Sequence, residues 1–413
     1  MDNLNDILVD KIVRDCISLY NSLPKSGKPS DGEWTVLSCV IQYGISTQKW
    51  KIVSLGTGSK CIGASKMSPM GNVLNDSHAE VIARRGFLLY LYENLLNAYR
   101  NKESIFEVQN RKVSLKKGIS FIFYSSQLPC GDASIIPKSD EECFGDVLAS
   151  KKHKLDCDEE TINNPKCPKI EDIHRTGAKC LPDQIQDSRS AGKEYHVVGQ
   201  VRTKPGRGER TLSVSCSDKI ARWIHVGIQG GLLGLLLAEP IFMSHFIFGA
   251  GVPYSKDTLE RAFFYRTNED KNDVKQRPIL CQSSIKFHPL KSDERSKAAS
   301  GSIICVNTSS RYEIDLTVQG KKLGVTKKKE NSPSSFLSVC KYSLFKKFQE
   351  VLNENEDLKS DLLVDKKIEN IKYNEVKNLS QKYLESWKLT KESIFKTWTK
   401  KPDMWNFSIK EFK

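Results

Sequence analysis

The chain has 413 residues, of which 38% are hydrophobic and 28% charged, a composition typical of a globular protein with one large domain or two average ones. No stretch approaches the roughly 20 apolar residues of a membrane span, and the N-terminus lacks the pattern of a secretory signal, so we expect neither a membrane protein nor a secreted one. Twelve cysteines in such a chain predict reduced thiols and a location in the nucleus or cytoplasm. A net charge of +14 favours an anionic partner such as nucleic acid, although solvated lysine-rich faces would give the same charge.

The first part of the chain predicts alternating helices and strands. Apolar residues at helical spacing indicate an amphipathic first helix, and Asn75-Asp76-Ser77 supplies capping chemistry for a second helix that begins at His78. A short apolar run predicts a buried strand that ends shortly before Pro129-Cys130. The predicted helices are 5–22 and 78–100. The predicted strands are 34–43, 50–55 and 119–124.

Residues 138–196 differ from the rest of the chain because they are polar, charged and without periodicity. We expect a partly disordered surface insertion in a single domain that spans residues 1–413. The cysteines in or beside this segment form no C-x-x-C pair, which favours free thiols over a second zinc site. Beyond it, the pattern predicts a helix over 217–237 and a strand over 240–248. Three further helices are predicted at 334–353, 374–391 and 393–398.

Two short motifs carry the clearest chemistry. His78-Ala79-Glu80 and Pro129-Cys130 match most of the H-x-E…P-C-x-x-C signature of zinc nucleobase deaminases. The residue three positions after Cys130 is Ala133 rather than cysteine, so the third ligand must come from elsewhere, and Cys216 is the best supplier. Three protein ligands with one open position are typical of catalytic zinc, and Glu80 would shuttle protons beside it. The same residues would also be found in a structural zinc site, or among core cysteines that bind no metal.

Basic residues interrupt two otherwise apolar helices. Arg84 and Arg85 fall in the helix after His78, and Lys219 and Arg222 lie one turn apart in the helix after Cys216. Burying a charge without a partner costs on the order of several kcal/mol, because the ion loses its hydration. We therefore expect partners for these side chains. A bound polyanion or RNA phosphate would supply them; alternatively, the side chains extend to solvent.

Three segments, 75–85, 128–134 and 215–219, together resemble the deaminase domain of the adenosine deaminases acting on RNA. The resemblance runs from about residue 30 to the C-terminus, apart from 138–196. It implies a cytidine-deaminase-like, three-layer α/β/α sandwich whose C-terminal helices enclose inositol hexakisphosphate, and a Zn²⁺-dependent conversion of adenosine to inosine. The residues that the resemblance assigns to the inositol hexakisphosphate are Asn75, Arg84, Arg85, Lys219, Arg222, Lys341, Lys377, Tyr383, Trp398 and Lys401. Where the family has a further lysine this chain has Trp387, with Lys388 as a possible substitute.

The resemblance also implies the substrate. Ser59 and Lys60 match residues that contact the flipped nucleotide, and Glu209 lies in the loop that fills the vacated base position. Segments 23–35 and 201–211 are most similar to the branch of the family that acts on tRNA, with A37 in the anticodon stem-loop of alanine tRNA as the expected target. One alternative is the editing of mRNA or duplex RNA, against which stands the lack of duplex-binding domains. Another is a catalytically silent RNA-binding protein with structural zinc, against which stands an intact Glu80.

Overall fold

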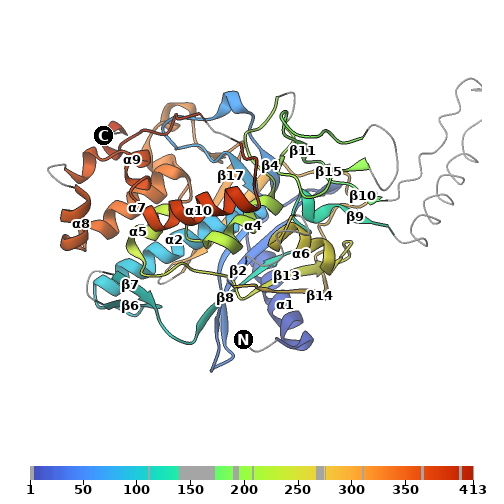
Figure 1. Cartoon of the computed structure of the whole chain (residues 1–413), viewed down its shortest axis with the longest axis horizontal. Coiled ribbons are helices and arrows are strands. Elements are labelled where there is room, and N and C mark those ends of the chain that lie inside the picture. The colour runs from blue at the N-terminus through green and yellow to red at the C-terminus, as the bar shows by residue number, and fades with distance from the viewer. Residues whose placement is uncertain are drawn as a thin grey trace, which may run out of the picture.

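A mixed sheet of eight strands runs through the centre of the molecule (Figure 1). In spatial order its strands are β14 (Ile279–Lys286), β13 (His245–Ala250), β8 (Ile119–Ser125), β2 (Leu37–Gly44), β3 (Trp50–Thr57), β16 (Gly301–Asn307), β17 (Tyr312–Val318) and β18 (Lys321–Lys322). β13 runs parallel to both of its neighbours, and every other neighbouring pair is antiparallel. This computed structural model describes residues 4–109, 112–138, 173–188, 195–206, 209–266, 274, 276–308, 311–363, 367–399 and 402–412.

Alternation of side chains along the central strands builds two cores, one on each face of the sheet. In β13, Phe246 and Phe248 enter the larger core, whereas Ile247 enters the smaller one. The smaller core is covered by α1 (Asp6–Ser22), whose N-terminus is capped by the Asn5 side chain, which accepts a hydrogen bond of 2.8 Å from the Leu8 amide. The helix predicted over 5–22 is therefore confirmed.

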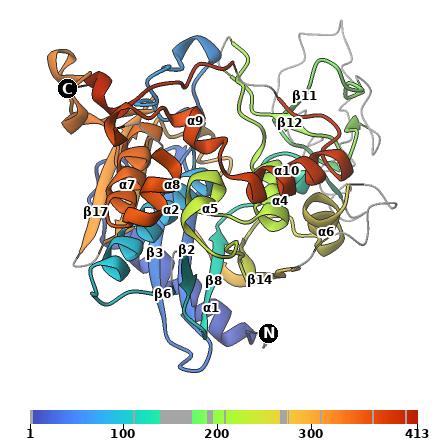
Figure 2. The same ribbon diagram turned by 60° about the vertical axis from the view of Figure 1, so that its left-hand side comes forward.

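The larger core is covered by a helical layer on the opposite face. α2 (Ala79–Tyr99) packs against β2, β3 and β16, and it is apolar nearly all round because further helices cover its outer side. α4 (Cys216–Val226) and α6 (Lys256–Phe264) pack against each other on the same face. Figure 2 shows the C-terminal helices over this layer: α7 (Lys341–Asn353) contacts α2, and α10 (Gln381–Ser393) contacts α4. The remaining helices are α5 (Gly230–Leu236), α8 (Glu356–Leu363) and α9 (Tyr373–Lys377).

Several predicted elements are shorter than the sequence pattern indicated. The single helix predicted over 217–237 is wrong, because Gly227 and Gly230 take φ values of 91° and 77° and divide it into α4 and α5. The helix predicted over 374–391 is likewise divided into α9 and α10 near Ser380. Residues 393–398 form no separate helix, and the strand after α5 begins at His245 rather than at residue 240.

Short strand pairs surround the sheet and bring distant segments together. β4 (Ser59–Cys61) pairs with β5 (Asp76–His78). The other pairs are β1 (Glu33–Trp34) with β15 (Lys297–Ala298), β6 (Phe106–Gln109) with β7 (Lys112–Leu115), β9 (Ile136–Pro137) with β10 (Ile173–His174), and β11 (Lys179–Cys180) with β12 (Arg202–Thr203). Within the segment predicted as an insertion, residues 139–172 and 189–194 lie outside the described residues. The part from 173 to 188 is attached to the domain through β10 and β11.

None of the helices in the described ranges combines the length and the apolar character that crossing a membrane would require.

Candidate active site

His78, Cys130 and Cys216 lie together and form a candidate zinc site. One ligand atom from each lies within 4.8 Å of the others. His78 Nδ1 is 3.9 Å from Cys130 Sγ and 3.6 Å from Cys216 Sγ. Imidazole and thiolate are preferred zinc ligands, and three protein ligands leave a fourth position open for water. Cys180, considered among the cysteines of the insertion, lies on β11 outside this group.

Three local structures bring these ligands together. His78 ends β5 and precedes the first turn of α2, and Cys216 is the first residue of α4. Cys130 follows β8 and is succeeded only by the single 3-10 turn η2 (Asp132–Ser134). Gly131 has a φ of 105°, and a side chain there would come within 2.2 Å of Ser215 Oγ, so the loops of Cys130 and Cys216 can approach only with glycine at this position.

The two thiols influence each other's protonation. A side-chain hydrogen bond from Cys216 lowers the pKa of Cys130, whereas burial raises the pKa of Cys216. The Cys216 amide also donates to Cys130 Sγ at 3.4 Å. A zinc ion binds thiolates, so the uptake of the metal would release the protons that these thiols still carry.

Glu80 has the burial and the freedom that a proton-transfer group needs. It lies in the first turn of α2, its side chain is buried, and burial raises the pKa of its carboxyl group. Its Oε2 atom has no hydrogen-bond partner among the described residues. A buried carboxylate oxygen without a partner is costly in a finished structure, which favours a role toward a bound molecule.

A chain of charged side chains connects the metal ligand Cys216 to Lys219 on α4. Lys204 Nζ donates to Cys216 Sγ at 3.1 Å and to the Asp76 carboxylate at 2.8 and 3.0 Å. Asp76 also pairs with Lys219, and its pKa is held well below its usual range by these two lysines against the opposing effect of burial. Sequence analysis identified Lys219 but missed Lys204 and recognised Asp76 only as a capping residue. The Asp76-Ser77-His78 sequence, an acid two residues before a ligand, was the available signal.

A second buried network fixes the loops that carry the ligands. Asp218 accepts hydrogen bonds from Ser215 Oγ at 2.6 Å and from Arg266 Nη2 at 2.8 Å. Arg202 is fully buried, and its guanidinium makes two hydrogen bonds of 2.6 and 2.7 Å with the Asp187 carboxylate. Because Asp187 belongs to the segment 138–196, this part of the segment supports the strand that leads to Lys204.

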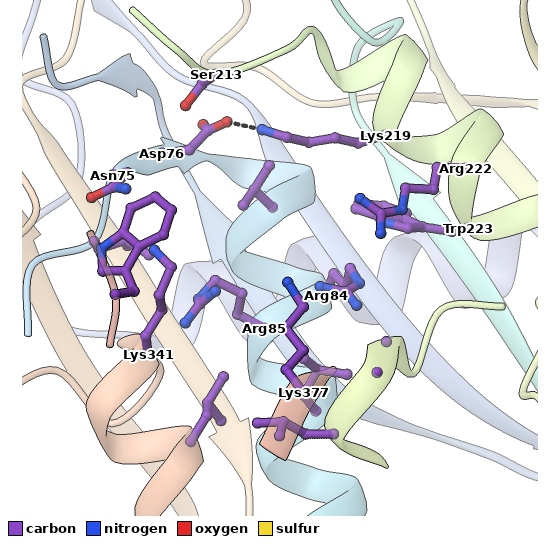
Figure 3. A pocket seen from close by; sticks show the side chains of 18 of the residues that line it. Asn75, Asp76, Arg84, Arg85, Ser213, Lys219, Arg222, Trp223, Lys341 and Lys377 are labelled. Atoms are coloured by element: carbon purple, nitrogen blue, oxygen red, sulfur yellow. Dashed lines mark hydrogen bonds and ion pairs between the residues drawn. The ribbon is translucent and has the colours of Figure 1, made fainter. Parts of the chain in front are cut away.

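Beside the metal ligands lies a cavity of about 400 Å³ between the helical layer and the C-terminal helices. Figure 3 shows basic side chains from α2, α4, α7 and α9 directed into it. Nine of the ten residues that the family resemblance assigned to a polyanion line this cavity: Asn75, Arg84, Arg85, Lys219, Arg222, Lys341, Lys377, Tyr383 and Trp398. The tenth, Lys401, lies outside the described residues. Lys388 is exposed and does not line the cavity, so the suggested substitution for Trp387 is wrong.

The charge of this cavity is unbalanced. Its lining contains six basic residues and one acidic residue, Asp76. Burial and the nearby charges of Arg222 and Arg84 lower the pKa of Lys377 to about 8, and burial lowers the pKa of Arg84 to about 10. Both Asn75 side-chain atoms, Arg222 Nε and Thr399 Oγ1 are buried with no hydrogen-bond partner in the described ranges. Such a lining fits a ligand with several negative charges and many acceptor oxygens.

Aromatic residues contact Arg222, one of the cations of this cavity. The Arg222 guanidinium lies 3.9 Å from the centre of the Trp387 ring and donates to the Tyr383 hydroxyl at 2.9 Å. Arg84 and Arg85 are anchored differently, through Nε donation to the carbonyl oxygens of Ile228 and Val339 at 2.8 and 2.6 Å. In each case one edge of the guanidinium is used for anchoring, which orients the group with respect to the cavity.

The predicted substrate residues lie close to the metal ligands in the fold. Ser59 is paired with His78 in the β4–β5 ladder, and its buried Oγ has no partner within the described part of the chain. Lys60 is exposed on the next position of β4. Glu209 accepts hydrogen bonds of 2.8 Å from the amide and the hydroxyl of Ser65, in the 3-10 helix η1 (Ala64–Lys66). The structure therefore attaches the Glu209 loop to the segment between β4 and β5; its role toward a base stays a prediction.

A candidate zinc site with His/Cys/Cys ligands and an adjacent buried glutamate is the arrangement of the zinc nucleobase deaminases. The chain belongs to the adenosine-deaminase (editase) domain family, which matches residues 54–402. It is 37% identical over 404 residues to the tRNA-specific adenosine deaminase 1 of Drosophila melanogaster, with 95% of both chains covered. It is 32% identical to the protein of that name from Homo sapiens, with 95% of this chain and 98% of the relative covered. The double-stranded RNA-specific adenosine deaminase of Mus musculus is 32% identical over 255 residues, which are 61% of this chain and 20% of the relative.

Proposed function

We propose that this protein converts adenosine to inosine in tRNA by hydrolytic deamination, with A37 in the anticodon stem-loop of alanine tRNA as its target. The observation that carries the proposal is the buried Glu80 carboxylate beside the His78, Cys130 and Cys216 ligand set, whose Oε2 atom has no hydrogen-bond partner among the described residues. The choice of tRNA is supported by relatives that match along 95% of this chain and are named as tRNA-specific. The relative named for double-stranded RNA matches over only 61% of it.

His78, Cys130 and Cys216 would hold the zinc ion, which when bound supplies Lewis-acid activation of water at neutral pH. Glu80 accepts one proton of the water that attacks C6 of adenine and transfers it to the ring nitrogen N1. It then accepts the second proton, from the hydroxyl group at C6, and transfers it to the amino group, which leaves as ammonia. The C6–O bond forms and the C6–N bond breaks, which leaves inosine. Lys204, at 3.1 Å from Cys216 Sγ, partly neutralises the thiolate charge and keeps that ligand oriented.

An adenine inside a base stack cannot reach such a buried group, so the nucleotide must rotate out of its stack. A loop position such as A37 makes this step less costly than a position in a duplex. We assign Ser59 and Lys60 to the flipped nucleotide, because Ser59 is paired with His78 and Lys60 follows it on the exposed side of β4. We assign Glu209 to the base position that the flipped nucleotide leaves.

We also propose that the basic cavity holds inositol hexakisphosphate, with Lys401 completing the nine residues that line it. The unbalanced charge and the unpartnered buried polar atoms support this assignment. Bound anion would pair with Lys219, and through the chain from Lys219 to Asp76 and Lys204 it would influence the orientation of Cys216. The anion would thus act on the fold and on the position of a metal ligand, not on the substrate.

The finer fold assignment belongs to the same proposal. Helical layers on both faces of a mixed sheet, with metal ligands before α2 and at the start of α4, support a cytidine-deaminase-like α/β/α sandwich. We propose a single catalytic domain over residues 1–413, interrupted by the insertion at 138–196, that works in the nucleus or the cytoplasm.

The experiment that tests the proposed function is incubation of the purified, zinc-loaded protein with transcribed alanine tRNA, followed by sequencing for inosine. We expect inosine at position 37 and none in a transcript that carries uridine there. A duplex RNA of the same length serves as the comparison substrate. Absence of inosine in the tRNA, or faster conversion of the duplex, would overturn the proposal.

A further inference from the structure

A second cavity, of about 440 Å³, lies between the loop that follows β4 and the hairpin formed by β17 and β18. Residues of the segments 66–73 and 321–337 line it, and we refer to it as the hairpin pocket. Its volume falls within the range of about 300–1,000 Å³ that is usual for small-molecule sites. The candidate metal ligands lie outside this pocket, and Val73 is the lining residue that it shares with the basic cavity.

The lining of the hairpin pocket combines an apolar wall with free amide groups. Val73, Phe336 and Leu337 contribute buried apolar surface. The Asn331 amide and Asn72 Nδ2 have no hydrogen-bond partner among the residues that the structure describes, whereas Asn72 Oδ1 accepts from Ser68 Oγ at 2.6 Å. An apolar wall beside amide groups suits a nucleobase, which has flat apolar faces and hydrogen-bonding edges.

The rim of the hairpin pocket carries excess positive charge. Lys321 is paired with Glu330, and Lys322 with Asp315 at 2.7 Å. The exposed lysines of the 3-10 helix η5 (Lys327–Lys329) and the exposed Lys66 have no ion-pair partner in the described ranges. Lys66 lines the pocket, and the η5 lysines lie in the chain between the lining residues Val325 and Glu330. This basic run therefore lies close in the chain to residues that line the pocket.

The pocket is continuous with the active-site segment. Lys66 ends η1, whose Ser65 holds Glu209, and Val73 lines both the hairpin pocket and the polyanion cavity. The hairpin is fixed to this segment because the Leu74 amide donates to the Gly320 carbonyl at 2.9 Å. Gly320 has a φ of 79°, and a side chain there would come within 2.2 Å of the Leu74 carbonyl oxygen. The segment that connects β4 to His78 thus follows the proposed substrate residues Ser59 and Lys60. Residues within 66–73 of this segment line the hairpin pocket.

We propose that the hairpin pocket binds one nucleotide of the RNA substrate, on the strand that continues from the nucleotide at the metal centre. This inference rests on the proposed function, because it assumes an RNA substrate. The base occupies the apolar wall, Asn72 and Asn331 contact its edge, and Lys66 and the η5 lysines contact the flanking phosphates. The chemistry is that of single-strand recognition, in which base contacts and phosphate contacts act together.

The test compares charge reversals at the pocket with matched reversals elsewhere. The test variant is Lys66→Glu combined with Lys328→Glu, and the control is Lys116→Glu combined with Lys117→Glu. Lys116 and Lys117 are also exposed, but they precede β8, whereas Cys130 follows its far end. A third variant, Asn331→Trp, fills the pocket at an exposed position without changing its charge. Steady-state kinetics on alanine tRNA are measured over a range of salt concentrations.

We expect the test variant to raise KM by at least about tenfold, with kcat within twofold of the wild type. The slope of log KM against log salt should fall by about 1 to 2, because each lost phosphate contact removes about one unit of slope. Asn331→Trp should raise KM without changing this slope. KM values within twofold of the wild type for both pocket variants, or an equal rise in the control, would overturn the inference.

Binding of a fluorescent 12-nucleotide single-stranded RNA, followed by anisotropy, separates this inference from the proposed function. If the wild type binds the RNA and the pocket variants bind it at least about tenfold more weakly, the pocket is an RNA site even when no inosine forms. If tRNA is deaminated normally but the pocket variants bind the RNA as the wild type does, the inference fails and the proposed function stands.

Discussion

The candidate metal centre and the basic cavity lie beside each other, but their charged groups are arranged differently. At the metal centre, the two thiols and the imidazole have protein partners close by, including Lys204 at 3.1 Å from Cys216 Sγ. In the cavity, six basic side chains face one carboxylate, and buried polar atoms of Asn75, Arg222 and Thr399 have no partner among the described residues. Both regions are built on the same two helices, α2 and α4, and Asp76 contacts lysines that belong to each.

This difference separates the groups that carry the chemistry from the groups that hold the fold together. The metal centre concentrates its chemistry in a single carboxylate, so a change there should affect the reaction and leave stability nearly intact. The cavity joins α2 and α4 to α7, α9 and α10 through charges that repel one another unless an anion is bound. A change there should affect stability first, because the binding free energy of such an anion is part of the free energy of folding.

The largest effect is expected for Glu80→Gln. The amide keeps the size of the side chain but cannot accept the proton of water, so deamination should fall by a factor of about 10² to 10⁴. Zinc content by elemental analysis and the melting temperature should match those of the wild type. Inosine formation at a rate near that of the wild type would show that another group transfers the proton.

A smaller effect, on stability, is expected for Arg222→Ala. The substitution removes the contacts with Trp387 and Tyr383 and one cation of the cavity. It also reduces the repulsion among the remaining cations, which would stabilise the fold. The sign of the change in the free energy of unfolding therefore shows which of the two effects is larger. With a bound polyanion we expect a loss of about 1.5–3 kcal/mol, the contribution of a charged hydrogen bond. Denaturant unfolding measures it, with exposed Arg311→Ala as the control. A variant more stable than the wild type would indicate that no polyanion balances these charges.

The smallest effect, in the pH dependence of stability, is expected for Lys377→Met. Without an anion, the pKa of Lys377 is lowered from 10.5 to about 8. Its charge would then reduce stability below pH 8, and this cost would disappear as the pH rises from about 8 to 10.5. A bound polyanion raises this pKa and reverses the sign, so the wild type should be more stable than the variant at pH 7.5 and stay so through pH 10. A variant more stable than the wild type at pH 7.5, with the difference vanishing at high pH, would contradict a bound polyanion.

The metal ligands could be predicted from sequence because each lies in a short motif after a strand and their residue types restrict the chemistry. Glu80 followed from its fixed spacing to His78. Lys204 and Asp76 could not be predicted, since their pairing depends on the β11–β12 and β4–β5 ladders, which bring residues 128 positions apart into contact. No local periodicity encodes such a contact.

The limits of the fold prediction have a similar origin. The pattern over 217–237 is apolar enough for one helix, but two glycines with positive φ values divide it, and glycine conformation is set by the tertiary packing. β16 and β17 were not predicted, although the sequence holds signals for both. β16 contains an uninterrupted apolar run over residues 303–306, and in β17 apolar residues such as Ile314 and Leu316 alternate with polar ones. The four basic cavity residues of α2 and α4 were indicated by their positions in apolar helices. The other cavity residues were found only through the family resemblance, because they lie on α7, α9 and α10, before α2 and after α10.

We propose that a polyanion balances the charge of the cavity and is bound as part of the fold. The most direct test is to denature the purified, active protein, remove it by filtration, and measure inositol phosphates in the filtrate by mass spectrometry. We predict inositol hexakisphosphate at about one molecule per chain for the wild type, because six cations face one acidic residue in the cavity. The absence of any polyanion from protein that is folded and converts adenosine to inosine would contradict the claim.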